Sequence, residues 1–311
     1  MRDPKSILAE AVVAEIAAAL PDPARRQVIL VGSLAAAYYF REDRPSDGVR
    51  TKDVDVLFSP HAKAVAAAQD VTEQLFDHDW TLRQAPDGKF SQPGRAEDAD
   101  HDLPLVRLLP PGVASDPDHW FLEFMSAPDG DQPGRPAKDM RRLTTKHGHF
   151  GLCSFGFLGL AEWQPMETRF GLKIARPEMM ALANLLHHPF IGEERIGESE
   201  DKRSNKDLGR VIALAHLAFM RQVRLGNEEL FDWPDRMTTA LRVKFGDAAP
   251  DLAARAGGGI QALLRSRTDL VQALAITQRS LLAGQAVDLD GFLATARRLE
   301  SWVLKPLATA F

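Results

Sequence analysis

The chain has 311 residues, of which 45% are hydrophobic and 26% charged, an ordinary composition for a globular protein with room for two domains of roughly 150 residues each. Its formal net charge of −5 excludes a general attraction to nucleic acid, so a polyanion would need a local basic patch. No apolar run approaches the roughly 18 residues of a membrane span, and Cys153 is the only cysteine, which excludes an intrachain disulfide. We expect a cytoplasmic, bacterial-type protein without a membrane partner.

The first expected element is a helix with Asp3 as its N-cap and Pro4 in its first turn, ended by Pro21. Charged residues interrupt its apolar positions, so the segment does not resemble a signal peptide.

A glycine turn follows. A buried strand over 27–31 (QVILV) leads through Gly32-Ser33 into a helix over 34–40 (LAAAYYF). Such a turn leaves free backbone N–H groups at the helix start, and these suit a phosphate. Gly32 and Ser33 are therefore candidate phosphate-binding residues, although Gly-Ser after a strand also occurs in ordinary turns.

The run TKDVDVLF (51–58) predicts a strand on which Asp53 and Asp55 share one face, while Val54 and Val56 share the other. Two like charges one pleat apart repel each other unless something neutralises them, and a divalent cation would do so. Simple polar and apolar alternation on a half-exposed strand is the competing explanation.

Later segments predict a helix over 62–76 and strands over 81–83, 105–109, 120–125 and 150–157, separated by loops at 85–104 and 126–138 that are rich in Pro, Gly and Asp. Glu123 is the single acid of WFLEFM (120–125) and the candidate third carboxylate, with Asp116 and Asp118 nearby in sequence. From Pro177 onward the patterns predict helices over 177–188, 206–225, 235–245, 259–283 and 290–308. The expected fold class is α+β: a domain with a mixed β-sheet over 1–170, then a helical domain over 171–311.

The order of these features carries a resemblance. Strand, Gly-Ser, helix, Asp-x-Asp on the next strand and a lone acid on a later one resemble the polymerase-β-type nucleotidyltransferase superfamily. PEMMALANLLHHP (177–189) and then Lys206-Asp207 opening a helix (RSNKDLGRVIAL) are similar to AbiEii-like nucleotidyltransferases, including the MenT-like toxins of bacterial toxin–antitoxin systems. The resemblance covers roughly residues 25 to 220 and implies a nucleotidyltransferase core.

The resemblance implies roles for individual residues. Gly32 and Ser33 would hold the β- and γ-phosphates of an NTP, and Lys206 and Asp207 would lie at the mouth of the site. Asp53, Asp55 and Glu123 would bind Mg²⁺ in a two-metal site, with Mn²⁺ as an alternative ion. Lys206-Asp207 as an ordinary exposed helix start is the competing explanation.

Two departures from the family pattern stand out. Residues 34–52 place nineteen positions between Gly-Ser and the first acid, where the family has about ten, and Asn184 stands where members often carry a lysine. Arg50, Lys52 or Arg203 could replace that lysine as the phosphate-binding cation.

Other candidates are weaker. The adjacent pair His187-His188 lacks the i, i+4 spacing of a helical metal site, and His147 and His149 have no companion acid or cysteine nearby. Residues 135–149 carry five basic side chains against Asp139 and could hold an RNA backbone, with a solvated loop and helix as the alternative.

The leading hypothesis is a Mg²⁺-dependent nucleotidyltransferase that moves NMP from an NTP to a hydroxyl of tRNA or protein and releases pyrophosphate. The resemblance further implies a toxin with a cognate antitoxin. A small-molecule transferase of the antibiotic-modifying kind and a non-catalytic nucleotide-binding or partner-binding module are the alternatives.

Overall fold

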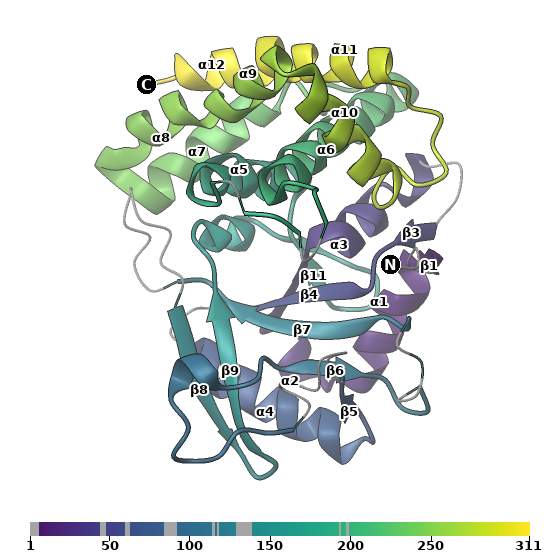
Figure 1. The fold of residues 1–311 in the computed structure, drawn as a ribbon, viewed down its shortest axis with the longest axis vertical. Helices are drawn as coiled ribbons and strands as arrows, with labels where there is room; N and C mark the ends of the chain where they lie inside the picture. Colours follow the sequence, from purple (N-terminus) through teal and green to yellow (C-terminus); the bar gives the residue numbers. More distant parts are fainter. Residues whose placement is uncertain are drawn as a thin grey trace.

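The structure is a computed structural model that describes residues 6–43, 48–59, 63–83, 92–113, 116, 118–128, 139–192, 194–196 and 199–311. Strands occupy the lower half of Figure 1, and a group of helices covers them from above. The protein is thus mixed α/β with a helical C-terminal region, as the sequence predicts at this level. None of the described helices is long and apolar enough to cross a membrane.

A mixed nine-stranded sheet forms the first half, in the order β10-β11-β2-β4-β7-β6-β5, with β9 pairing both β7 and β8. Its strands are β2 (Val28–Val31), β4 (Asp53–Phe58), β5 (Thr81–Leu82), β6 (Arg107–Leu109), β7 (Phe121–Ser126), β8 (Asp139–Thr145), β9 (Gly148–Ser154), β10 (Met166–Glu167) and β11 (Lys173–Ile174). A separate two-stranded sheet pairs β1 (Ser6–Leu8) with β3 (Gly48–Arg50). The large sheet therefore includes residues up to Ile174.

The central strands explain where the acids meet. Strand β4 runs antiparallel to β2 and parallel to β7, and β7 runs antiparallel to β6. All four residues of β2 are buried, as are the last three of β4, because this part of the sheet is covered on both faces. Only the first residues of β4 carry charge.

Helices pack on the sheet and above it. The first half has α1 (Ala9–Ala19), α2 (Asp22–Arg25), α3 (Gly32–Tyr39), α4 (Ala64–Asp77) and 3-10 turns at Arg41–Asp43, Asp100–Asp102 and Leu158–Glu162. The helical half has α5 (Pro177–His187), α6 (Arg203–Leu225), α7 (Trp233–Phe245), α8 (Ala249–Ala256), α9 (Gly258–Arg265), α10 (Arg267–Gln278), α11 (Leu289–Leu299) and α12 (Lys305–Ala308), with 3-10 turns at His188–Phe190 and Gly246–Ala248. The buried apolar residues of both halves form one continuous cluster.

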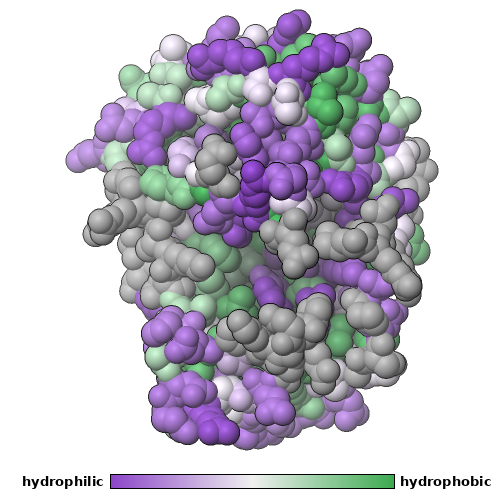
Figure 2. Space-filling view, viewed as in Figure 1, coloured by the Kyte–Doolittle hydropathy of each residue, from purple (hydrophilic) through white to green (hydrophobic). Residues whose placement is uncertain are grey.

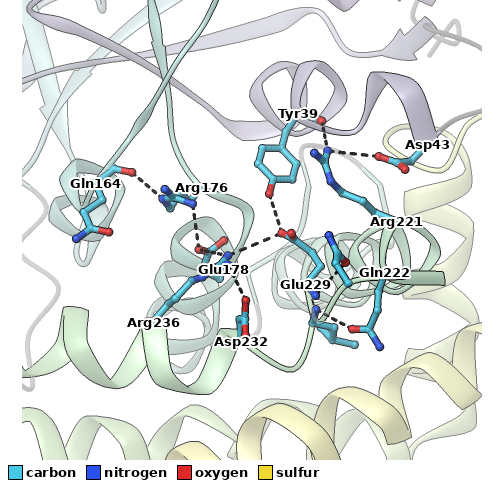
Figure 3. A network of polar contacts seen from close by, with 12 residues as sticks. Tyr39, Asp43, Gln164, Arg176, Glu178, Arg221, Gln222, Glu229, Asp232 and Arg236 are labelled. Atoms are coloured by element: carbon cyan, nitrogen blue, oxygen red, sulfur yellow. Dashed lines mark hydrogen bonds and ion pairs between the residues drawn. The ribbon is translucent and has the colours of Figure 1, made fainter. Parts of the chain in front are cut away.

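A polar network joins α3 to the helical half (Figure 3). The Tyr39 hydroxyl donates to Glu229 Oε1 at 2.7 Å, and Arg221 donates to the Tyr39 carbonyl at 2.9 Å and to Asp43 at 3.4 Å. Arg236 lies 3.3 Å from Glu178 and 3.9 Å from Glu229. These contacts hold the end of α3 against α6 and α7.

Several sequence predictions are corrected. The first helix begins at Ala9 rather than near Asp3, because residues 6–8 pair with 48–50 as a strand; Asp3 and Pro4 lie outside the described residues. Within the basic stretch 135–149, residues 139–145 form strand β8 instead of a loop and helix, since β9 offers a complete antiparallel partner. Most of the loop 126–138 and part of 85–104 also lie outside the described residues.

The C-terminal helices are shorter than predicted. Ser266 ends α9 and caps α10, its side chain accepting from the Asp269 N–H, so 259–283 is two helices. The expected 290–308 helix contains a π-helical turn at Glu300–Leu304. Helix α8, which starts at Ala249-Pro250, was not among the predicted elements.

Candidate acidic site

The two aspartates of β4 lie on one face of the sheet, as alternation requires. Val54 and Val56 point to the opposite face and are buried, at 0% and 1% exposed. Asp53 is exposed and Asp55 half-buried. Because the buried valines fix the orientation of the strand, the two carboxylates must share the face that the sequence predicts.

Glu123 lies on that same face of the neighbouring strand. In the parallel pairing of β4 with β7, Asp55 is the partner of Glu123, and Asp53 is the partner of Phe121. Partners in register on adjacent strands project to the same face. The structure therefore brings together all three carboxylates that the sequence singles out.

Gly32 lies beside Asp55, directly after the neighbouring strand β2. It follows Val31, the β2 partner of Asp55, and starts α3 with a φ of +73°. A Cβ at this position would collide with the Asp55 Oδ2 atom. Glycine is thus required both by the backbone conformation and by the approach of a carboxylate, while Ser33, 5% exposed, lies in the first turn of α3.

The carboxyl of Asp55 is electrostatically unbalanced. Burial, followed by the charges of Asp53 and Glu123, raises its pKa to about 7, against the opposing effect of Arg210 and Lys206. Within the described part of the chain, no ion pair of Asp55 with a Lys, Arg or His side chain offsets this shift. The position would gain a large stabilisation from a cation.

Two cations of α6, in the helical half, interact electrostatically with the acids. Lys206 and Arg210 are one helical turn apart, and both act electrostatically on Asp55. The Arg210 charge, followed by burial, lowers the pKa of the Lys206 ammonium, whereas Asp53 and Asp55 raise it. Figure 2 shows a recess between the sheet half and the helical half, with hydrophilic and hydrophobic residues exposed within it.

Asp207, the neighbour of Lys206, also acts electrostatically on two histidines. Burial lowers the pKa of His187 and of His188, at the end of α5, and the negative charge of Asp207 opposes this shift. Lys206 therefore interacts electrostatically with Asp53 and Asp55 as well as with its neighbour Asp207, and Asp207 also interacts with the two histidines.

Two arginines from the β5 and β6 region of the sheet also interact with the acids. Arg107 Nε lies 2.5 Å from Glu123 Oε2, and the two residues are register partners on β6 and β7. The Arg83 guanidinium stacks over the Phe121 ring at 4.1 Å and interacts electrostatically with Asp53 and Glu123. Glu123 thus already has a cationic partner.

Other predicted cations have other partners. Lys52 Nζ lies 2.5 Å from Asp118, and Arg203 lies 3.1 Å from Glu194. Arg50 is exposed on the separate two-stranded sheet, and Asn184 is half-buried on α5. Lys206 and Arg210 are therefore the cations whose placement best fits the role assigned to the missing lysine.

In the basic stretch 135–149, of which Arg135 and Lys138 lie outside the described residues, Arg142 and Lys146 pair with acids elsewhere in the chain. Arg142 bonds Asp100 and the carbonyl groups of residues 95, 96 and 98, and Lys146 lies 2.6 Å from Asp77. His147 also lies 3.7 Å from Asp77. These cations brace β8 against neighbouring segments, which does not favour an RNA-binding role. Cys153 is buried.

The acids suit a magnesium ion in their chemistry, because Mg²⁺ prefers a few carboxylates together with water and phosphate oxygens. The high pKa of Asp55 supports the same fit. Among the residues that the structure describes, however, no three His, Cys, Asp or Glu side chains form a group ready to hold a metal ion. The ion pair of Glu123 with Arg107 gives a physical reason.

Sequence reasoning missed Arg83, Arg107 and Arg210. The i, i+4 spacing from Lys206 could have identified Arg210 as its neighbour on one helix face. Of the two other arginines, Arg107 lies on the short strand β6 and Arg83 directly follows β5, and the position of these strands beside the acids depends on the sheet order, which the sequence does not display. No protein-family model, curated protein or solved structure matches the chain.

Proposed function

We propose that this protein is a Mg²⁺-dependent nucleotidyltransferase that transfers NMP from an NTP to a hydroxyl acceptor. The observation that carries the proposal is the register of Asp53, Asp55 and Glu123 on one face of the sheet, beside the glycine that starts α3. The cations Lys206 and Arg210 act electrostatically on Asp55. The order of these elements along the chain adds the resemblance to polymerase-β-type nucleotidyltransferases.

Each group has a chemical task in this proposal. Asp53, Asp55 and Glu123 would hold Mg²⁺, which when bound supplies positive charge at the phosphate oxygens and at the attacking hydroxyl. The N–H groups at the start of α3, at Gly32 and Ser33, donate to the terminal phosphates. Lys206 and Arg210 neutralise the triphosphate from the opposite side.

The reaction is an in-line displacement. The acceptor oxygen forms a bond to the α-phosphorus, the bond from the α-phosphorus to the bridging oxygen breaks, and pyrophosphate leaves with that oxygen. The hydroxyl proton passes to a carboxylate or to water. The proposed acceptor is a tRNA 3′ end or a protein hydroxyl. We also propose that the protein is a toxin with a cognate antitoxin. Both proposals follow from the family resemblance alone.

The test is incubation of purified protein with each α-labelled NTP, Mg²⁺ and total tRNA or total protein. We expect label to appear on one macromolecule with one preferred NTP and to disappear with Asp55→Asn. Label that stays off both macromolecules but moves to aminoglycosides or other small polyols would favour the small-molecule transferase.

A non-catalytic nucleotide-binding module is the second candidate, favoured by the ion pair between Glu123 and Arg107. Calorimetry of NTP binding with Mg²⁺ separates the two, since both predict binding and only the transferase predicts pyrophosphate release. Binding at micromolar affinity without pyrophosphate release from any NTP would contradict the transferase.

A further inference from the structure

Arg107 and Glu123 form the closest ion pair at the acidic site. Their Nε and Oε2 atoms lie 2.5 Å apart, and they are direct partners across the antiparallel strands β6 and β7. The Glu123 side chain is only 16% exposed and that of Arg107 is 39% exposed. A charge-assisted hydrogen bond in such partial burial is stronger than a surface ion pair.

The pair concerns the same carboxylate that the proposed metal site requires. Asp55 is the register partner of Glu123, so a cation at Asp55 would recruit Glu123 as its neighbouring ligand. A guanidinium and a divalent ion repel each other at such short range. Metal binding and the ion pair therefore compete for Glu123.

Without a metal, the pair also relieves repulsion. Three carboxylates on one face raise one another's energy, and Glu123 is among the charges that act on Asp55. Arg107 supplies the nearest compensating charge. The same contact thus stabilises the metal-free protein and weakens its affinity for metal.

We propose that Arg107 is a positioning residue that holds Glu123 away from the metal position and thereby sets the metal affinity of the site. The inference rests on the proposed function, because it presupposes that Asp53, Asp55 and Glu123 hold a divalent ion. Beyond that function, Arg107 would control when Glu123 becomes a metal ligand.

The test measures Mn²⁺ binding to the full chain by calorimetry, without nucleotide or acceptor. We expect Arg107→Gln to bind Mn²⁺ about tenfold more tightly than the wild type, a change of the size produced by altering groups that orient metal ligands. Without metal, the same variant should unfold at lower urea concentration, and saturating Mn²⁺ should restore its stability at least to the wild-type level.

Matched variants isolate the contact. Arg83→Gln removes a similar charge close to the same acids without breaking the Glu123 ion pair, and it should tighten Mn²⁺ binding much less. In the Glu123→Gln background, Arg107→Gln should lose its tenfold gain. Arg242→Gln, far along the chain on α7, should leave the affinity unchanged.

Specific results would overturn the inference. Equal tightening by Arg83→Gln and Arg107→Gln would reduce the effect to general charge, and weaker binding by Arg107→Gln would mean that the arginine supports the metal. Either result, obtained while the wild type binds Mn²⁺ through Asp55, leaves the proposed function intact. Absence of Mn²⁺ binding in the wild type and in Arg107→Gln alike would contradict both proposals, whereas binding by Arg107→Gln alone would support this one.

Discussion

Two groups of carboxylates in this protein have opposite electrostatic arrangements. Glu178 is fully buried and Glu229 nearly so, and both lie within 4 Å of Arg236 in the network of Figure 3. The Tyr39 hydroxyl donates to Glu229 as well. At the acidic site, the charges of two other acids, Asp53 and Glu123, act on Asp55 against those of Arg210 and Lys206.

The contrast separates acids that support the fold from acids suited to a ligand. Burial raises the pKa of Glu178, but Arg236 and Arg176 oppose the shift, so this carboxylate has local partners. For Asp55 the neighbouring acids add to the effect of burial. Unbalanced charge of this kind is concentrated at functional sites, because folding gains nothing from it.

The largest expected effect is on the transfer reaction. Asp55→Asn should lower the rate of label transfer by at least about 10³-fold, since it removes a central metal ligand at the phosphate. Glu229→Gln, a change of the same chemical kind in the other group, should lower it by less than about tenfold. The measurement is the transfer rate of each variant at saturating NTP. Equal rates for Asp55→Asn and Glu229→Gln would contradict the contrast between the two groups of acids.

Arg236→Met should have the largest effect on folding. It leaves Glu178 buried beside only Arg176, at 4.0 Å, and should lower the free energy of unfolding by about 3–5 kcal/mol. Arg242→Met, at an exposed position of the same helix, is the control and should cost less than about 1 kcal/mol. Urea denaturation measures both, and similar losses would show that the network does not carry stability.

The pH dependence of stability should have a distinctive sign. The pKa of Asp55 is about 7 in the folded protein and near 3.8 in the unfolded chain. The contribution of Asp55 to the free energy of unfolding is therefore complete below pH 4 and is lost as the pH rises to 7. Asp55→Asn should remove this loss. With metal chelated, the free energy of unfolding of the variant should match that of the wild type at pH 4 and exceed it by about 2 kcal/mol at pH 8. This figure is smaller than the pKa shift alone implies, because solvent screens the partly exposed Asp55 carboxylate.

Denaturation of both proteins across this pH range provides the measurement. An Asp55→Asn variant less stable than the wild type at pH 8 would mean that the aspartate has a close cationic partner, and the contrast between the two groups would disappear.

The smallest expected effect concerns the glycine beside Asp55. Gly32→Ala should lower the free energy of unfolding by about 2 kcal/mol, from its φ of +73° and from contact with the Asp55 carboxylate. Gly171→Ala is matched, with φ of +76° and nothing within 4 Å of the added Cβ. It should cost about 1 kcal/mol. Thermal denaturation of both tests whether the carboxylate adds to the strain.

The sequence predicted the local elements of the site better than its surroundings. Strands β2, β4 and β7 and helix α3 lie within a few residues of their expected positions, because buried apolar runs and alternation are local signals. Strand β8 was missed because its basic residues resemble a solvated segment, and only pairing with β9 and contacts such as Arg142 with Asp100 make it a strand.

By itself, the sequence determined that Asp53 and Asp55 share a face and that a glycine turn precedes them, since both follow from the two-residue period of a strand and from glycine's backbone freedom. Only the tertiary structure decided that Glu123 stands in register with Asp55, that Lys206 interacts electrostatically with the acids, and that Arg107 pairs with Glu123. Strand order and helix packing set these relations, because they depend on contacts between segments far apart in the chain.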